Sequence, residues 1–300
     1  MVDLTVGLAG IRMDNPVVPA SGTWGIESQK ILLEAGRFRP GALVTKSVTI
    51  EPRPGNPPPR LRETASGLIN WIGLAGPGID RFLADELSVW LSFGQPVIVS
   101  IAGKTPQEYV HLAQCLGDTR ISGIELNISC PNVGGTIIGT DPQLTAEIVR
   151  ATRLATGLPL IVKLTPNVTD IAAIAKAAER EGANAIVAVN TFTAMRINPN
   201  TGQVIISGGL SGPAIMPQAL RKVWEVCRAV KIPVIGMGGI ASASDALEFL
   251  WAGASAVAVG TANFGNPLVM AEIIEGIAGW LEQNGFGSLE EFRQKKAECR

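Results

Sequence analysis

Cysteine and histidine, the side chains that most often bind zinc or an iron–sulfur cluster, are scarce in this chain. It has four cysteines, Cys115, Cys130, Cys227 and Cys299, and one histidine, His111. No two of the cysteines form a CxxC pair, so the chain has no zinc or iron–sulfur ligand set of familiar spacing. His111 lies in a helical pattern, and we interpret it as a structural or surface residue. We therefore predict no metal site.

The chain also lacks an excess of charge of either sign, since its formal net charge is −1. This balance gives no indication of binding to nucleic acid or to an acidic surface. The first residues lack the basic and apolar regions of a signal peptide, and no apolar run is long enough to cross a bilayer. We expect a cytoplasmic protein that binds neither nucleic acid nor membranes.

Short apolar runs, in contrast, are abundant. Hydrophobic residues make up 46% of the 300 residues, which is enough for one large domain with a full core. The runs are nearly continuous, as in strands that are buried on both faces of a parallel sheet. We place eight strands at residues 16–22, 42–48, 96–101, 123–128, 160–165, 185–190, 233–239 and 256–261. Their alternation with helical segments predicts a (β/α)8 barrel as a single domain, residues 1–300, with a doubly wound open sheet as the alternative.

Three segments fall outside this repeat. Residues 4–13 predict a short N-terminal hairpin. Residues 51–78, rich in proline and glycine, and residues 191–213 are long excursions between a strand and the next helix. Because such excursions inside a compact domain are usually functional or disordered, we interpret them as loop insertions at the active site.

The fourth predicted strand ends in a polar cluster. Asn127 can donate and accept hydrogen bonds, and Cys130 can act as a nucleophile or carry a proton. Pro131 removes a backbone donor and prevents the sheet from continuing, and a glycine-rich segment follows at residues 132–139. A thiol at the end of a barrel strand beside such a loop indicates a reaction centre. The alternative is a small buried cysteine in a turn that ends the strand.

Two lysines follow apolar strand residues, at the strand ends where a barrel places its active site. Lys46 and Lys163 would face a mostly apolar mouth, where an unpaired cation is costly. They therefore indicate an anionic ligand, unless each pairs with a glutamate or an aspartate. The other polar or glycine residues at these ends are Ser21, Ser100, Asn190, Thr191, Gly238, Gly239, Gly260 and Thr261.

The glycine turns after the seventh and eighth strands occupy the usual phosphate position of a barrel. Glycine lets backbone N–H groups approach a phosphate closely. The glycines at residues 73–78 have the wrong spacing for a nicotinamide fingerprint and follow no predicted strand. Flavin mononucleotide (FMN), lying over the barrel mouth beside a lysine, would fit. A phosphorylated sugar would fit equally well on composition alone.

Seven short motifs, in order between about residues 4 and 275, resemble the dihydroorotate dehydrogenases. These motifs are Thr45-Lys46-Ser47, Asn70-x-x-Gly73-Leu74, Asn127-x-Ser129-Cys130-Pro131-Asn132, Lys163-Leu164-Thr165-Pro166-Asn167, Asn190-Thr191, Gly208-Gly209-Leu210-Ser211-Gly212-Pro213 and Gly236-x-Gly238-Gly239-Ile240. A cysteine at position 130 resembles class 1, because class 2 enzymes use serine and carry an N-terminal extension. The fourth and sixth motifs are most similar to class 1B, the catalytic subunit of the NAD-linked enzymes.

The resemblance implies a role for each matching residue. Cys130 would remove a proton from C5 of dihydroorotate while FMN takes hydride from C6. The pyrimidine and its carboxylate would be held by Lys46, Asn70, Trp71, Ile72, Gly73, Leu74, Asn127, Asn190 and Thr191. FMN would be held by Ser21, Thr45, Lys46, Ser100, Asn127, Lys163, Val189, Gly212, Gly238, Gly239, Gly260 and Thr261. The family commonly has an asparagine near the flavin where this chain has Ser100, so the shorter serine would lose that contact or make it through a water. The family frequently has a lysine where this chain has Met216, and we expect little effect of this difference on the chemistry.

The resemblance to class 1B also implies an assembly. A homodimer of this chain would be flanked by two partner subunits that carry FAD and an iron–sulfur cluster and pass electrons to NAD. One alternative is a homodimer that delivers electrons to fumarate, as in class 1A. A second is a dihydropyrimidine dehydrogenase module with the same barrel, FMN and cysteine base. A non-redox lyase or isomerase acting on a sugar phosphate, or a non-catalytic binding protein, would be of another class.

Overall fold

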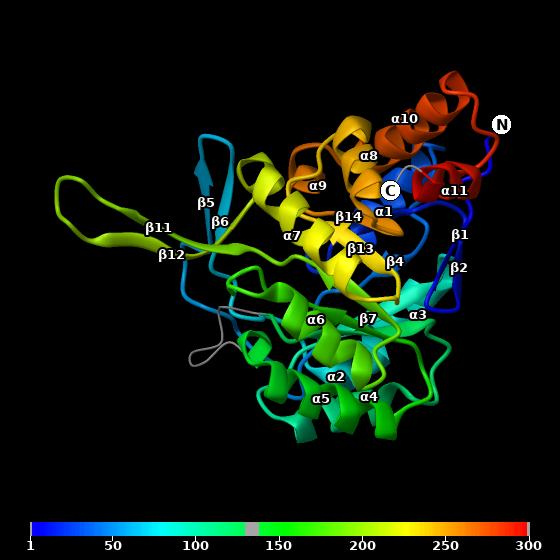
Figure 1. Cartoon of the computed structure of the whole chain (residues 1–300). Helices are drawn as coiled ribbons and strands as arrows, with labels where there is room; N and C mark the ends of the chain where they lie inside the picture. Colours follow the sequence, from blue (N-terminus) through cyan, green and yellow to red (C-terminus); the bar gives the residue numbers. More distant parts are fainter. Residues whose placement is uncertain (1, 130–137, 299–300) are drawn as a thin grey trace.

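The computed structural model describes residues 2–129 and 138–298 of the chain. The predicted base, Cys130, lies outside the described residues. The chain begins with the predicted hairpin, in which β1 (Val6–Leu8) and β2 (Ile11–Met13) pair antiparallel. The left-handed residues Ala9 and Gly10 make the turn between them. Figure 1 shows this hairpin at one side of a ring of strands and helices.

Eight parallel strands form the ring. Their order in the sheet is β3 (Val17–Pro19), β14 (Ala256–Val259), β13 (Val234–Met237), β10 (Ala185–Ala188), β9 (Leu160–Lys163), β8 (Gly123–Asn127), β7 (Val97–Ile101) and β4 (Leu43–Val44). The backbone N–H of Gly41, just before β4, donates to the carbonyl of Val17 in β3 at 2.8 Å and so joins the two ends of the sheet. The predicted (β/α)8 barrel is confirmed, and the open-sheet alternative is wrong.

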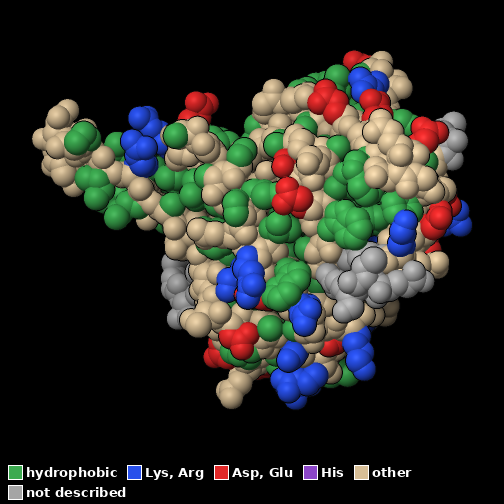
Figure 2. Space-filling model, turned by 45° about the horizontal axis from the view of Figure 1, so that its top comes forward, with side chains coloured by type: hydrophobic (Ala, Val, Ile, Leu, Met, Phe, Trp, Pro, Cys, Tyr) green, Lys and Arg blue, Asp and Glu red, His purple; other side chains and the backbone are tan. Residues whose placement is uncertain are grey.

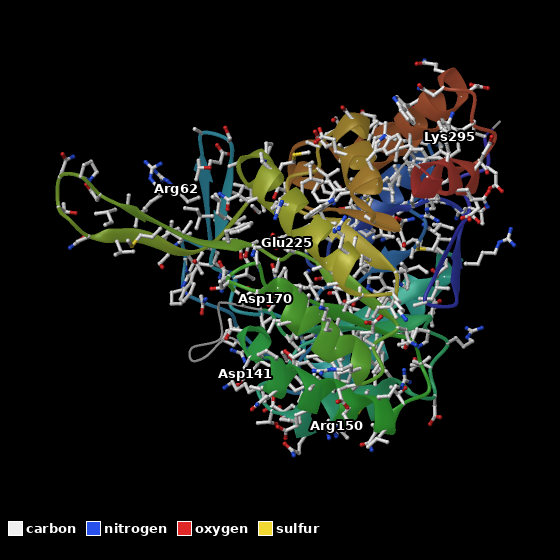
Figure 3. The ribbon with its side chains drawn as sticks, in the orientation of Figure 1. Arg62, Asp141, Arg150, Asp170, Glu225 and Lys295 are labelled. Carbon is white, nitrogen blue, oxygen red and sulfur yellow. The ribbon has the colours of Figure 1, made fainter. Side chains whose placement is uncertain are left out.

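Helices surround the barrel, and several begin just after a polar side chain that caps their first turn. Thr105, Asp141 and Asp170 accept hydrogen bonds from backbone N–H groups in the first turns of the helices that follow them, and Ser242 forms a reciprocal capping box with Asp245. Asp141 and Asp170 are labelled in Figure 3. The helices that follow the strands are α1 (Ile26–Glu34), α2 (Ile79–Arg81), α3 (Leu87–Ser92), α4 (Pro106–Leu116), α5 (Pro142–Ala155), α6 (Ile171–Arg180), α7 (Met216–Ala229), α8 (Ala243–Ala252) and α10 (Val269–Gln283).

The two long excursions meet in one four-stranded antiparallel sheet, which we name the upper sheet. Its strand order is β11 (Phe192–Ile197), β12 (Val204–Ser211), β6 (Gly67–Asn70) and β5 (Leu61–Thr64). A Cβ at Gly208 would lie 2.0 Å from the carbonyl oxygen of Asn70, so glycine allows β12 to approach β6 this closely. Figure 1 shows the β11–β12 hairpin projecting far from the barrel. We expected loops at these positions, so this sheet was not predicted from the sequence.

The projecting hairpin carries apolar side chains into solvent. Met195, Ile197 and Val204 are each about half exposed. Figure 2 shows hydrophobic side chains along this hairpin, with basic side chains near its base. One basic residue of the upper sheet is Arg62 of β5, which is labelled in Figure 3.

The C-terminal part of the chain packs against the outside of the barrel. The short helix α9 (Ala262–Gly265) follows β14, and α11 (Leu289–Glu298) follows α10. Ring contacts join Trp251 of α8, Trp280 of α10 and Phe292 of α11, with centroids 4.7–6.4 Å apart. In the described part of the chain, no helix combines the length and the apolar character that a membrane span requires.

Candidate active site

A cavity of about 340 Å³ opens at the carboxyl ends of the barrel strands, between the barrel and the upper sheet. Both layers contribute to its walls, since residues that follow the strands line one side and residues of β5, β6 and β12 line the other. The predicted site residues found in this lining are Ser21, Lys46, Asn70, Ile72, Gly73, Leu74, Asn127, Lys163, Val189, Asn190, Thr191, Gly212, Gly238, Gly239, Gly260 and Thr261. The fold therefore brings these dispersed residues together, and their individual roles stay predictions.

Three predicted residues lie away from the cavity surface. Thr45 and Ser100 are fully buried, and the Ser100 backbone N–H donates to Thr45 Oγ1 at 3.2 Å. Ser100 is separated from the cavity by Ser47, whose hydroxyl lies 2.8 Å from its own. Trp71 donates its backbone N–H to the carbonyl of Arg60 and is absent from the lining.

A chain of hydrogen bonds fixes the side chain of Asn127. Its Nδ2 donates to Ser47 Oγ at 2.8 Å, and its Oδ1 accepts from Ser129 Oγ at 2.9 Å. Asn190 Nδ2 extends the chain by donating to Ser129 Oγ at 2.9 Å. Tyr109 holds the backbone from behind, because its hydroxyl donates to the Asn127 carbonyl at 3.0 Å. A buried network in which donors and acceptors are matched holds its members in one orientation.

This network includes residues to which the sequence analysis assigned no role. Ser47 and Ser129 stand within the Thr-Lys-Ser and Asn-x-Ser motifs, so their positions were visible as part of those patterns. Tyr109 is the only tyrosine of the chain, and its buried hydroxyl needs a partner. No local sequence pattern connects it with Asn127.

Lys163 meets both expectations for a lysine at a strand end, since it faces the cavity and also pairs with an acidic side chain. Its side chain lines the cavity, and its Nζ donates to Ser21 Oγ at 2.7 Å. Its Nζ also lies 3.9 Å from Glu125 Oε1 on the neighbouring strand, with both side chains at most 5% exposed. The expected alternative, a lysine paired with an acid, is therefore found at Lys163. Glu125 was not among the residues predicted from the sequence.

Lys46 has a different setting at the cavity mouth. The residue is exposed, and it forms no ion pair with any described residue. Neighbouring atoms still remove part of the hydration of its ammonium group, which lowers its pKa below that of an ordinary lysine. The positive charge of Arg60 lowers this pKa further, and Glu86 opposes the shift. A cation that has no acidic partner is free to bind an anionic ligand.

The glycine turn after β13 is shaped by packing as well as by its backbone. Gly238 and Gly239 have φ angles of +132° and +81°, which side chains rarely adopt. A Cβ at Gly239 would lie 2.6 Å from the Met216 side chain and 2.8 Å from the Gly212 carbonyl oxygen. A Cβ at Gly260, in contrast, would meet no atom closer than 3.5 Å. Of Gly239 and Gly260, only Gly260 leaves space for a side chain that the protein itself does not fill.

Ser129 and Gly139 lie close together at the end of β8. Ser129 is fully buried there, and the backbone N–H of Gly139 donates to the carbonyl of Ile128 at 2.9 Å. Both residues are therefore held at the strand end that carries Asn127.

Comparison with known proteins identifies the family. The family model described as dihydroorotate dehydrogenase matches residues 3–281. The catalytic subunit of dihydroorotate dehydrogenase B (NAD(+)) from Pelobacter propionicus is 48% identical over 297 residues, covering 94% of this chain and 95% of its own. The proteins of the same name from Geobacillus kaustophilus and Trichlorobacter lovleyi are 47% and 48% identical, covering 96% and 95% of this chain and 94% and 96% of their own. With this match along most of its length, the chain belongs to the dihydroorotate dehydrogenase family.

Proposed function

We propose that the protein oxidises (S)-dihydroorotate to orotate, the redox step of pyrimidine (UMP) biosynthesis, as an FMN-dependent catalytic subunit. The observation that carries this proposal is the cavity, in which two lysines, three asparagines and the glycine turns converge in a chain of this family. Lysine suits the anionic groups of flavin and substrate, and amide side chains match the donors and acceptors of a pyrimidine ring.

The residues on the barrel side fit FMN. Gly260 leaves an unfilled space at the cavity wall, and Thr261 places a hydroxyl beside it. Backbone N–H groups of Gly238, Gly239 and Gly260 would hold the phosphate, and Lys163 would lie beside the ring system. When bound, FMN supplies a two-electron acceptor.

A second group of lining residues, from both the barrel and the upper sheet, fits the pyrimidine. Lys46 would bind the carboxylate of dihydroorotate. Asn70, Asn127 and Asn190 would form hydrogen bonds with the donors and acceptors of its pyrimidine ring. Because hydrogen bonds to neighbouring side chains of the protein fix the Asn127 amide, this residue would orient the substrate without reorganising. Cys130, next to the buried Ser129, would remove the proton from C5.

The visible spectrum of the purified protein tests this proposal. We expect flavin absorbance that bleaches on anaerobic addition of dihydroorotate, with one FMN released per chain on denaturation. Bleaching by dihydrouracil but not by dihydroorotate would instead favour a dihydropyrimidine dehydrogenase. A protein that binds no flavin would contradict the proposal and favour a non-redox barrel enzyme.

Substitution of Gly260 by alanine is expected to weaken FMN binding about tenfold or more, because an added methyl group would enter space that the ligand needs. The protein itself has room for the methyl group, so the melting temperature should change little. Fluorescence titration of the apoprotein with FMN measures the effect. Gly265→Ala is the matched control, since a Cβ there meets no atom within 4 Å. Equal FMN affinity of the Gly260→Ala variant and the parent would contradict the assignment of Gly260.

A separate subunit would carry the electrons onward. The relatives are named as catalytic subunits of an NAD(+) enzyme, and we propose that this chain works as a homodimer flanked by two partners with FAD and an iron–sulfur cluster.

Purified alone, the chain is therefore expected to reduce artificial dyes with dihydroorotate but to make almost no NADH. Adding the partner subunit should restore NADH formation, which absorbance at the NADH band measures. Substantial NADH formation by the chain alone, or efficient reduction of fumarate, would contradict the partner proposal and leave the oxidation of dihydroorotate standing.

A further inference from the structure

One buried acidic side chain has an incomplete set of partners. Glu125 of β8 is only 4% exposed, and its Oε1 accepts no hydrogen bond from any residue that the structure describes. Among the buried side-chain atoms without a hydrogen-bond partner in the described residues, this is the one that belongs to an ionisable group. Burying a carboxylate without full compensation is costly, so a purely structural position would favour an apolar residue.

The ion pair of Glu125 connects it with the cavity. Its Oε1 lies 3.9 Å from Lys163 Nζ, which is too long for a hydrogen bond but close enough for strong electrostatic interaction at this depth. In the sheet, Lys163 is paired with Asn127, two residues beyond Glu125 on the same face of β8. Lys163 lines the cavity, and Glu125 does not.

The Lys163 side chain also spans the barrel mouth. Its Nζ donates to Ser21 Oγ, which follows β3, and β3 is separated from β9 by three strands in the sheet. The ammonium group is therefore held between one hydroxyl across the barrel and one carboxylate on the neighbouring strand.

We propose that Glu125 is a positioning residue that acts through Lys163. It holds the ammonium group at the cavity floor and cancels part of its positive charge, and in this way it sets the preference of the cavity between oxidised and reduced FMN. This inference rests on the proposed function, because it requires FMN beside Lys163.

The sign of the effect follows from the charges. Reduced flavin carries more negative charge near its pyrimidine ring than oxidised flavin does. Removing the Glu125 charge leaves the Lys163 ammonium uncompensated, so the cavity becomes more positive and favours the reduced form. We expect Glu125→Gln to raise the affinity for reduced FMN relative to oxidised FMN about tenfold, which corresponds to about 30 mV in a two-electron potential.

The test is a double-mutant cycle with Glu125→Gln, Lys163→Met and the double variant. The midpoint potential of bound FMN is measured for each variant in excess FMN, together with the dissociation constants for oxidised and reduced FMN. In the Lys163→Met background Glu125→Gln should lose most of its effect, because Glu125 is proposed to act through the Lys163 ammonium group, which this background lacks. If Glu125→Gln proves too unstable to purify, Glu125→Met makes the same charge change without leaving a polar atom.

Thr145→Val on α5 is the matched control. Thr145 Oγ1 is also buried without a hydrogen-bond partner among the described residues, but Thr145 is not part of the cavity lining, so its removal should leave the potential unchanged. An unchanged or lowered potential in Glu125→Gln would overturn the inference, as would an equal shift in the Lys163→Met background. A parent protein that binds FMN and is bleached by dihydroorotate in the same experiments keeps the proposed function separate from this outcome.

Discussion

Replacing Cys130 with alanine is expected to slow the reduction of bound flavin by dihydroorotate by about 10²–10⁴-fold, the usual contribution of a positioned general base. FMN should stay bound, because the backbone groups proposed to hold its phosphate follow other strands, β13 and β14. The proton at C5 would then have no acceptor at the position beside Ser129. Anaerobic stopped-flow mixing with dihydroorotate, followed at the flavin band, measures the rate.

Cys115→Ala is the matched control for this experiment. Cys115 is a partly buried thiol on α4, 3.7 Å from His111 Nε2, and it is absent from the cavity lining. This variant should reduce flavin at the parent rate. If Cys130→Ala also reduces flavin at the parent rate, another group is the base.

Replacing Lys46 with methionine is expected to weaken orotate binding by about 10- to 100-fold, the range for a hydrogen bond to a charged group. Lys46 forms no ion pair with a described residue, so its ammonium group is available to the carboxylate of the ligand. The change in the flavin spectrum on titration with orotate gives the dissociation constant. Lys295→Met on α11, labelled in Figure 3 and far from the cavity lining, should bind orotate as the parent does.

The dependence of orotate binding on pH is a second test of the role of Lys46. Because the pKa of Lys46 is lowered in the folded protein, its ammonium group loses its proton at a lower pH than an ordinary lysine. Orotate binding should therefore weaken as the pH rises through that range, while the carboxylate of orotate stays charged. In Lys46→Arg the charge persists to higher pH, so the loss should move in the alkaline direction. Orotate binding that is independent of pH in the parent would contradict the role of Lys46.

The barrel could be predicted from the sequence because its signal is local. Strands such as residues 160–163 and 256–259 are short apolar runs between helical segments, and they lie where the pattern places them. Polar residues that follow such runs must gather at one end of the barrel, and for this reason Lys46, Asn127 and Lys163 were found.

The upper sheet could not be predicted in the same way. It pairs residues 68–70 with residues 209–211, so its evidence is a contact between distant segments rather than a local pattern. Proline and glycine in the first excursion also favoured turns over strands. The contacts of Thr45 and Ser100 depended on which face each side chain takes, and a strand end does not fix this.

Glu125 was missed for a related reason. It stands inside an apolar strand, where its neighbours Ile124 and Leu126 are buried. Its significance depends on the register of β8 against β9, which sets it close to Lys163. No property of residues 123–127 alone reveals a cation on the next strand.

The division of the cavity between two sheets has a consequence for how new activities could arise. The groups proposed to hold FMN stand mostly on the barrel, whereas part of the set proposed to bind the pyrimidine, residues 70–74, lies at the end of β6 of the upper sheet and just after it. The barrel and the upper sheet are separate hydrogen-bonded sheets. Mutations that change substrate choice can therefore accumulate in the upper sheet while the flavin chemistry is inherited intact. In protein engineering, the upper sheet is the part to randomise and the barrel is the part to preserve.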